Sequence, residues 1–388
     1  MLKYKIPNTG CSIVVVRRAG GAVVRVRFTA SRQDMYNLKE FKAVFDPILK
    51  TYLDQRIEEF NLQTSDDFIK DFVLHSKKIV LNEGKRLRPY LAYLMYCSLN
   101  GKDIENALKV FSALEIFHAF ALIHDDIIDK ATKRHGVNAV HLYISENLNK
   151  EKRLGNLTHI GNSQAILVGD LLFSLSSEIF SKSNGFETEN IQKAREYYYK
   201  MVDEVILGQM LDVDVTTKNE VSEKTIEEKT RLKTSRYSCV RPMQIGGSLA
   251  NPNYSLEDFC ENLGTRVGIA FQIQDDLLDI VGDEEKTHKS VLNDIAERQH
   301  TFFTNYVFTK GSNKQREYLK SVFGKKVTDE NKDEIRSLFI DSGAIDAGKN
   351  IISDNLNKAK EIIKNSSLEG LYKESFLELI QVLEQRQS

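Results

Sequence analysis

The chain has 388 residues, with 54 Lys or Arg against 55 Asp or Glu, and its net charge of −1 gives no reason to expect nucleic-acid binding. Its four scattered cysteines fit neither a metal spacing nor a disulfide framework, which favours a reducing compartment, and no run approaches the ~18 apolar residues of a transmembrane helix. Five prolines and 41% apolar residues predict an all-α protein with a substantial core.

The first 33 residues differ from the rest because they hold seven basic residues and no Asp or Glu. Such a composition is typical of organelle transit peptides, but this segment is poor in Ser, and residues 13–28 resemble short strands. We expect residues 1–34 to be an N-terminal extension, either poorly ordered or a leader. The protein is expected in the cytoplasm, or in an organelle if residues 1–33 are a transit peptide.

Apolar residues recur every three or four positions from Leu38 to Leu53, which predicts that the helical body begins near Leu38. A basic cluster follows later, where Gly84 and Pro89 bracket three cations. These are Lys85, Arg86 and Arg88. The cluster is either a surface loop or an anion site, in which Arg supplies forked donors and Lys a point charge.

Residues 111–136 predict a buried helix that ends in acid. On a wheel of about 3.6 residues per turn, one stripe carries His118, Ala121, Asp125 and Asp129. Buried carboxylates are costly unless they are paired, and no Lys or Arg precedes Lys130 in this helix. A hard divalent cation such as magnesium suits this set of ligands. A helix cap or a solvated acidic turn explains one such motif equally well.

The middle of the chain predicts further helices. Residues 196–214 form one, in which Asp212 either contacts a cavity or simply ends the helix. Residues 218–229 are highly charged and are expected to face solvent. A helix is then expected to open at Lys233 and Thr234 and to continue to Gly247.

A second acidic motif lies at residues 275–279, at the end of another apolar helix. Asp275, Asp276 and Asp279 repeat the earlier spacing, and Gly264 and Gly268 fall beneath Asp275 on the wheel. Two apolar helices with acidic tips and small residues below them predict a deep apolar cavity with a metal-lined mouth. This geometry suits a ligand with a diphosphate head and a hydrocarbon tail.

Five motifs together resemble those of the head-to-tail trans-isoprenyl diphosphate synthases, in the order of that family. They are Gly84-Lys85-Arg86-x-Arg88-Pro89, Glu115-x-x-His118 with residues 125–129, Gly208-Gln209, Lys233-Thr234, and Phe271-Gln272 with residues 275–279. The resemblance covers residues 38–301 well. It implies that residues 35–388 form a single-domain helical bundle around a deep central apolar cavity, of the isoprenoid synthase type, and that the protein is a homodimer.

The resemblance also implies the cofactor, which is magnesium, with three ions per active site. Asp125 and Asp129 would bind two ions and Asp275 the third, with Asp126 and Asp279 in support. These ions would clamp an allylic diphosphate while its C–O bond ionises.

The implied substrates are isopentenyl diphosphate and an allylic diphosphate, and the reaction joins them into a longer prenyl diphosphate. The residues implied in substrate binding are Lys85, Arg88, His118, Arg134, His135, Lys233, Thr234, Gln272 and Lys289. Of these, Arg134, Lys233 and Lys289 would grip the allylic diphosphate, and Lys233 counts with Asp125, Asp129 and Asp275 as catalytic. Lys85, Arg88 and His118 would hold isopentenyl diphosphate.

Two positions depart from the family pattern. His135 replaces an Arg that normally helps to bind isopentenyl diphosphate, and Gln299 stands where a Lys is usual. Both changes remove positive charge near diphosphates. They leave room for a terpene cyclase that ionises one prenyl diphosphate. A non-catalytic partner subunit of a synthase is a further alternative, although such a subunit is expected to lose acidic residues that are all present here.

Product length is argued from the residues below the first acidic motif. Phe120 lies five residues before Asp125, roughly 7 Å along the helix axis, whereas Ala121 directly beneath Asp125 is small. A single aromatic at this depth resembles the pattern of C20 synthases, and two adjacent aromatics resemble that of C15 synthases. We expect a C20 product, or C15. Phe120 could instead pack between helices, with a deeper floor setting the length.

Overall fold

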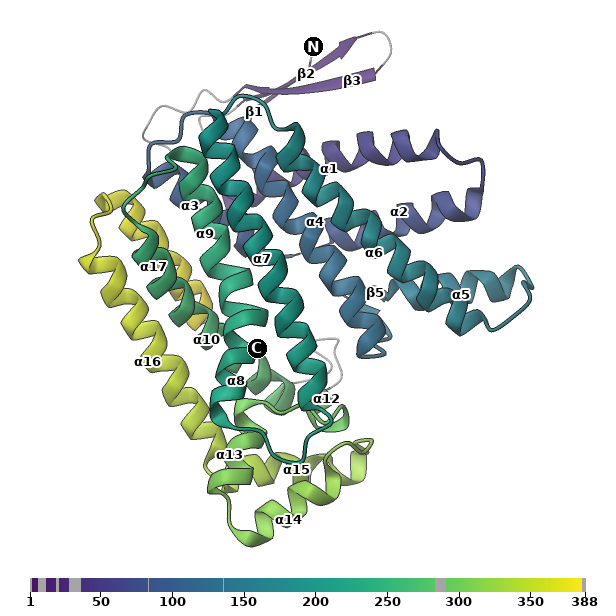
Figure 1. Cartoon of the computed structure of the whole chain (residues 1–388), viewed down its shortest axis with the longest axis vertical. Helices are drawn as coiled ribbons and strands as arrows, with labels where there is room; N and C mark the ends of the chain where they lie inside the picture. Colours follow the sequence, from purple (N-terminus) through teal and green to yellow (C-terminus); the bar gives the residue numbers. More distant parts are fainter. Residues whose placement is uncertain are drawn as a thin grey trace. The chain divides into compact units, whose positions relative to one another are not determined.

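A computed structural model describes residues 2–5, 12–18, 21–27, 36–82, 84–134, 136–282 and 291–385, with backbone alone for the first three ranges (Figure 1). Its internal contacts divide the chain into two compact units, Met1–Ile191 and Gln192–Ser388. Helices dominate both units, which confirms the all-α class. The division into an extension of residues 1–34 and a single domain of residues 35–388 stays a prediction.

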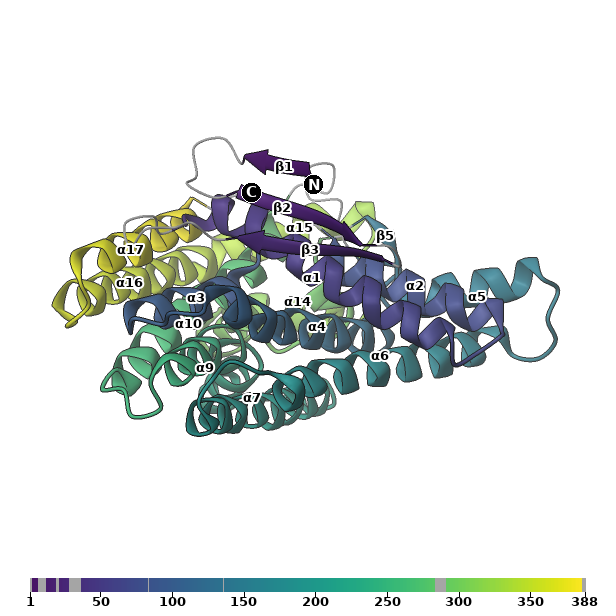
Figure 2. The same ribbon diagram turned by 90° about the horizontal axis from the view of Figure 1, so that it is seen from above.

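The strands expected near residues 13–28 are present as an antiparallel meander. It consists of β1 (Leu2–Lys5), β2 (Ser12–Arg18) and β3 (Gly21–Arg27), in the order β1-β2-β3. Ser12 pairs with Arg27 and Arg18 with Gly21, and β2 and β3 run side by side (Figure 2).

Unit 1 is built around α4, the helix that ends in the first acidic motif. The helices of this unit that lie wholly within it are α1 (Leu38–Asn61), α2 (Asp67–Leu81), α3 (Leu87–Ser98), α4 (Ile104–Ile128), α5 (Val140–Lys150) and α6 (Leu157–Lys182). α6 runs along α4, and α3 and α1 also pack on α4 (Figure 1). Aromatic side chains fill the core between them, among them Phe41, Phe45, Tyr90, Tyr93, Phe111 and Phe117.

The first helix of the body begins at Leu38, as its apolar spacing predicts. The Asn37 side chain accepts hydrogen bonds from the amides of Lys39 and Glu40, both at 3.0 Å, and the Glu40 carboxylate in turn accepts one from the Asn37 amide. This reciprocal cap satisfies amides that would otherwise lack partners in the first turn. Asp103 caps α4 by accepting from the Asn106 amide. Local side-chain chemistry therefore sets both starting points.

Unit 2 is built around α10, the helix that carries the second acidic motif. Its helices are most of α7 (Thr188–Val215), α8 (Glu223–Thr230), the π-helix η1 (Arg231–Val240), α9 (Arg241–Ala250), α10 (Glu257–Val281), α12 (Asn293–Ala296), α13 (Phe302–Lys310), α14 (Asn313–Val322), α15 (Asp329–Asp341), α16 (Ala344–Asn365) and α17 (Gly370–Glu384). α10 packs against both η1 and α16. A cluster of buried residues joins the end of α10 to α12, α13, α14 and α15.

The helix expected to open at Lys233 begins ten residues earlier, at Glu223. Ser222 caps it by accepting from the Thr225 amide, and α8, η1 and α9 then follow without a break. The charged stretch before Lys233 is only partly exposed, since the Lys229 side chain is 11% accessible. The expectation that residues 218–229 all face solvent is therefore wrong at Lys229, because this side chain has an acidic partner inside the unit.

The two glycines beneath Asp275 make room for a neighbouring helix. A Cβ at Gly268 would overlap the Cα of Ser235, and one at Gly264 would lie 2.8 Å from the Val240 nitrogen. Both contacts are with the backbone of η1, which cannot move aside cheaply. These small residues therefore serve the close packing of η1 on α10.

Two helices of unit 1, α4 and α6, are long and apolar enough to cross a membrane by length and composition, with mean hydropathy of 1.4 and 1.2 over their best windows. Core helices of soluble proteins pass the same test, and 67% of the α4 window is buried within the protein. The expectation that the chain has no transmembrane segment therefore stays a prediction.

Candidate active site

The basic cluster alternates between exposed and buried side chains. Lys85 is exposed, Arg86 is 4% exposed, and Arg88 lies half-buried in the first turn of α3. Arg86 contacts two carboxylates, with Nε 2.8 Å from Asp46 and Nη1 2.7 Å from Glu115. One of the three cations is thus an internal residue, and Lys85 and Arg88 are the two that remain candidates for binding an anion.

The three carboxylates at the acidic end of α4 have different surroundings. Asp126 is buried and is held by Arg134, whose Nε donates at 2.8 Å and whose Nη2 also donates to it. The Asp125 carboxylate is 22% exposed and lies 3.8 Å from the same Nη2. Asp129 follows one turn later as the C-cap, its amide donating to the Asp125 carbonyl. Asp125 and Asp129 are thus the pair best suited to a metal, and Asp126 orients Arg134.

A short hairpin presents Arg134. It consists of β4 (Lys133–Arg134) and β5 (Val137–Asn138), which pair antiparallel. His75 of α2 anchors β5, because its Nε2 donates to the Asn138 carbonyl at 3.1 Å. The His75 ring also stacks on Tyr143, with centroids 3.7 Å apart. His135 lies outside the described residues, so its predicted role is untested.

His118 and Phe120 lie on α4 before the acidic motif, and both are partly buried. His118 is half-buried. Phe120 packs against three rings, with centroids 5.2 Å from Phe117, 5.3 Å from Phe173 and 4.6 Å from His124. The position expected to limit product length is therefore an aromatic cluster between α4 and α6.

Asp212 of α7 joins two lysines in unit 2. Its carboxylate accepts from Lys229 of α8 at 2.9 Å and from Lys233 of η1 at 2.6 Å. Burial alone would raise the pKa of Asp212, but the charges of Lys233 and Lys229 outweigh it and hold the pKa below its usual value. A Cβ at Gly208 would lie 2.6 Å from the Lys233 nitrogen, so the glycine of the Gly208-Gln209 motif lets η1 approach α7. Asp212 thus fixes Lys233.

The predicted Thr234 and Gln272 form one hydrogen-bonded chain with the second acidic motif. The Thr234 hydroxyl donates to Gln272 at 2.5 Å, and the Gln272 amide donates to Asp276 at 2.7 Å. Burial raises the pKa of Asp276 to about 7, and the charges of Asp275 and Asp279 act in the same direction. This middle carboxylate is therefore held by η1 and α10, as Asp126 is held by Arg134.

Asp279 also accepts hydrogen bonds from backbone amides. Its two carboxylate oxygens accept from the amides of Asn293 and Asp294, each at 3.1 Å, which fixes the start of α12. Burial raises the pKa of Asp294 well above its usual value, and the charges of Asp279 and Asp276 add to the shift. Gln299 follows α12, and its side-chain oxygen is buried without a hydrogen-bond partner among the described residues. Lys289 lies outside them.

The carboxylates of the two acidic motifs form pairs that could each bind a metal ion. Within the described parts of the chain, no three His, Cys, Asp or Glu side chains gather as a ligand cluster. Asp125 with Asp129, and Asp275 with Asp279, each stand one helical turn apart, and both motifs offer oxygen ligands. Magnesium is usually bound by one or two carboxylates together with waters and substrate phosphates. Each pair therefore has the composition that magnesium uses when a phosphate completes its ligands.

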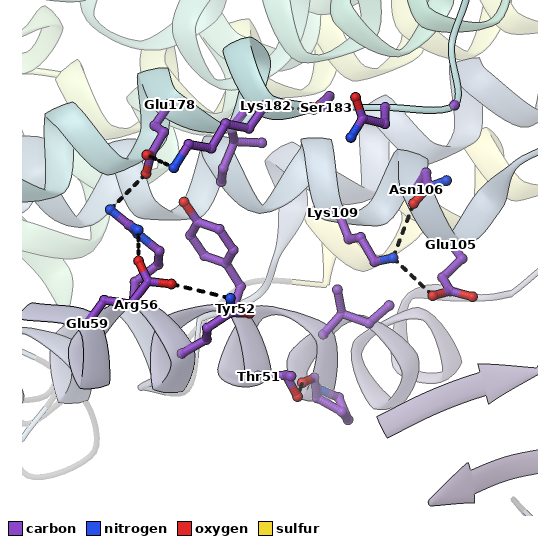
Figure 3. Close-up of a pocket in the computed structure, with 16 residues that line it drawn as sticks. Thr51, Tyr52, Arg56, Glu59, Glu105, Asn106, Lys109, Glu178, Lys182 and Ser183 are labelled. Atoms are coloured by element: carbon purple, nitrogen blue, oxygen red, sulfur yellow. Dashed lines mark hydrogen bonds and ion pairs between the residues drawn. The ribbon is translucent and has the colours of Figure 1, made fainter. Parts of the chain in front are cut away.

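Unit 1 also has a pocket of about 620 Å³ at the far end of α4, near Glu105 and Lys109 (Figure 3). α1, the start of α4 and the end of α6 line it. Its charged residues pair with each other, since Arg56 contacts Glu178 at 3.0 Å and also Glu59. None of the predicted site residues lines this pocket, and it lies about 30 Å along α4 from the acidic motif.

Comparison with known proteins decides the family. The polyprenyl synthetase family matches residues 72–339 of this chain. The chain belongs to this family, that of the trans-isoprenyl diphosphate synthases.

Relatives of known activity agree with this assignment. A short chain isoprenyl diphosphate synthase of Methanothermobacter thermautotrophicus is 32% identical, over 71% of this chain and 79% of that protein. A geranylgeranyl diphosphate synthase of Methanosarcina mazei is 31% identical, over 74% and 81%. The crystal structure of a geranylgeranyl pyrophosphate synthase from Corynebacterium glutamicum, complexed with isoprenyl diphosphate and magnesium, has a TM-score of 0.85 at 28% identity. That match covers 90% of this chain and 100% of the other.

Three residues that lie beside the predicted site residues are not among those predicted for the site. They are Arg86, Lys229 and Asp294. Lys229 stands one turn before Lys233, a spacing that indicates a shared helix face once the helix is known to begin at Glu223. Arg86 reads as one more surface cation, and only its burial distinguishes it. Nothing in the sequence signals that Asp294 approaches Asp279.

Acidification is expected to weaken unit 1 through His75. Burial lowers the pKa of His75 below its usual value, and its Nδ1 is buried without a hydrogen-bond partner in the described part of the chain. The unfolded chain then takes up the proton first, so stability is present above about pH 6.5 and is lost as the pH falls below it. We expect the melting temperature to fall between about pH 7.5 and pH 5.5, and His75→Gln to reduce that fall.

Scanning calorimetry of both proteins across this range measures the difference. His159→Gln, at an exposed position on α6, is the matched control and should follow the wild type. An identical pH dependence in wild type and His75→Gln would contradict the assignment.

Proposed function

We propose that this protein is a head-to-tail prenyltransferase that condenses isopentenyl diphosphate with an allylic diphosphate to give a short-chain all-trans prenyl diphosphate, C20 or C15. The observation that carries the proposal is the pair of acidic motifs. Each ends an apolar helix, and in each the middle carboxylate has an internal partner while the outer two stand one turn apart. The family match and the relatives named as geranylgeranyl diphosphate synthases support it.

Magnesium is the proposed cofactor, with three ions per active site. Asp125 and Asp129 would hold two of them, and Asp275 with Asp279 the third. When bound, the ions supply Lewis-acid stabilisation to the diphosphate that leaves the allylic carbon. Arg134 and Lys233 add fixed positive charge, because Asp126 and Asp212 hold these two side chains in place before substrate arrives.

The second substrate is proposed to bind without metal, at Lys85, Arg88 and His118. The allylic C–O bond breaks, and its electron pair leaves with diphosphate. The double bond of isopentenyl diphosphate then forms the new carbon–carbon bond, and the resulting cation loses a proton to the released diphosphate. Apolar surroundings protect this cation from water. The reaction therefore needs no protein base.

Product length is proposed to be C20, with C15 as the close alternative. The rings of Phe117, Phe120 and Phe173 pack together between α4 and α6, at the depth where Phe120 is expected to limit the chain. Relatives carry both geranylgeranyl and geranylfarnesyl names, so the family accommodates products of this size and larger. No finding favours a terpene cyclase or a non-catalytic subunit.

A homodimer is proposed because α7 leaves an apolar face exposed. We define the α7 apolar face as Tyr199, Ile206, Leu207, Met210 and Val213. Leu207 is 55% and Met210 63% exposed, and steps of three and four residues place them on one stripe. A second copy of this chain is the proposed occupant, since one helix face can pair with itself about a two-fold axis.

We also propose that the enzyme works in the cytoplasm, or in an organelle if residues 1–33 act as a transit peptide. The basic, acid-free composition of that segment supports the second case. Imaging the full chain beside a form that lacks residues 1–33 separates them: an organellar signal that depends on the segment would exclude the cytoplasmic case.

A product assay tests the proposed reaction. Purified protein is incubated with magnesium, labelled isopentenyl diphosphate and each of dimethylallyl, geranyl and farnesyl diphosphate. We expect labelled C20 or C15 diphosphate, and we expect Asp125→Ala to abolish incorporation while helix content stays nearly unchanged, because the first metal pair is lost. Chromatography of polar and hexane-extractable products provides the readout.

Asp333→Ala, which removes an exposed carboxylate on α15, is the control and should keep full activity. Retained activity in Asp125→Ala would remove the metal assignment. A hydrocarbon or alcohol formed from the allylic substrate alone, without label, would instead identify a terpene cyclase.

The dimer has its own test. Leu207→Lys places a charge in the α7 apolar face and is expected to convert a species of twice the 44.3 kDa chain mass into one of single mass. Val382→Lys makes the same kind of change at a 44% exposed position on α17 and should leave the mass unchanged. Sedimentation equilibrium measures both, and a wild-type protein of single mass would overturn the proposal.

A further inference from the structure

The basic cluster contains one cation that the proposed reaction does not use. Arg86 stands between Lys85 and Leu87, yet its side chain is only 3% accessible. Its backbone adopts φ 55° and ψ 33°, the left-handed conformation that residues with a Cβ seldom take. An arginine kept at such a position, where glycine would fit without strain, indicates that its side chain makes contacts worth that strain.

Those contacts tie the basic cluster to three helices. Nε donates to Asp46 of α1 at 2.8 Å, and Nη1 donates to Glu115 of α4 at 2.7 Å. Nη1 also donates to the Val80 carbonyl of α2 at 3.1 Å, and Nη2 to the Asn82 carbonyl just beyond α2 at 3.2 Å. The planar guanidinium has donors in several fixed directions, which suits one group that must reach several acceptors at once.

The neighbours of Arg86 depend on this anchor. A Cβ at Gly84 would lie 3.1 Å from Arg86 Nη1, so the glycine leaves space for the guanidinium. With Arg86 turned inward, Lys85 before it is exposed and Arg88 after it begins α3. Glu115 stands three residues before His118 on α4, so the same contact links the cluster to the helix face that carries His118.

We propose that Arg86, through Glu115, is a positioning residue that sets Lys85 and Arg88 in register with His118. The inference rests on the proposed function, which assigns those three side chains to isopentenyl diphosphate. Arg86 itself does not touch substrate. Its charge is already balanced by two carboxylates, so it contributes geometry to the isopentenyl site and no binding charge.

Steady-state kinetics of Arg86→Lys and Glu115→Gln test the proposal. Lysine keeps the charge but cannot reach both carboxylates and the two carbonyls with a single ammonium group. Misplacing binding groups by about 1 Å can cost up to about a hundred-fold. We expect the KM for isopentenyl diphosphate to rise about ten-fold or more in both variants, while the KM for the allylic diphosphate stays within about two-fold of the wild type.

The matched control is Arg56→Lys, in the pocket of Figure 3. Arg56 is also a largely buried arginine of unit 1 between two carboxylates, Glu59 and Glu178, and it joins α1 to α6. Its replacement is expected to lower the melting temperature as much as Arg86→Lys does, without changing the ratio of the two KM values. A general loss of stability would move both variants alike, so the ratio separates positioning from stability.

The double variant Arg86→Met with Glu115→Leu covers the case in which a single change fails to fold. It removes both buried charges together, and we expect it to fold and to keep the raised KM for isopentenyl diphosphate. Unchanged KM ratios in all folded Arg86 and Glu115 variants, beside an active wild type, overturn this proposal alone. A wild type that incorporates no labelled isopentenyl diphosphate overturns the proposed function, and this inference with it.

Discussion

The structure depends on how each unit holds three carboxylates close together at one helix end. An acidic motif cannot gather three charges at a helix end without help, because their repulsion and partial burial favour protonation. In unit 1, Arg134 neutralises Asp126, the middle residue of the motif. In unit 2, the amide of Gln272 holds Asp276, whose pKa rises to about 7. In each motif an internal partner therefore holds the middle carboxylate, and the outer two stand one helical turn apart.

A second constraint is the close approach of backbones. η1 winds with π-helical hydrogen bonds, the Arg241 amide reaching back to the Arg236 carbonyl, and π segments often occur at functional sites. Gly264 and Gly268 of α10 and Gly208 of α7 each leave the space that η1 occupies. η1, the helix that carries Lys233 and Thr234, therefore packs closely against α10 on one side and α7 on the other. Its side chains can be placed accurately because the backbone beneath them has no room to shift.

Much of this could be predicted from the sequence, since the relevant signals are local. The start of α1 follows from Asn37 and the apolar spacing, and the two acidic motifs lie at the helix ends expected for them. The errors came from contacts between distant segments. The sequence predicts that Lys229 faces solvent, because its partner, Asp212, lies on another helix. It predicts that Gly268 lines a cavity, because nothing in the local sequence indicates the approach of η1. Spacing along one helix cannot reveal a neighbour that arrives from elsewhere in the chain.

The choice between arginine and lysine follows from the same demands. The Nε and Nη2 groups of Arg134 both donate to Asp126. In the described part of the chain its Nη1 makes no hydrogen bond. One edge of the guanidinium is therefore held by Asp126, and the donors of Nη1 are left for another acceptor. Lys233 can meet Asp212 with a single ammonium group and, at 30% exposure, still has access to solvent. The planar guanidinium of arginine donates in fixed directions, whereas the ammonium group of lysine is a point charge on a flexible stem. Both side chains are therefore held by a buried carboxylate, Arg134 through two donors and Lys233 through one.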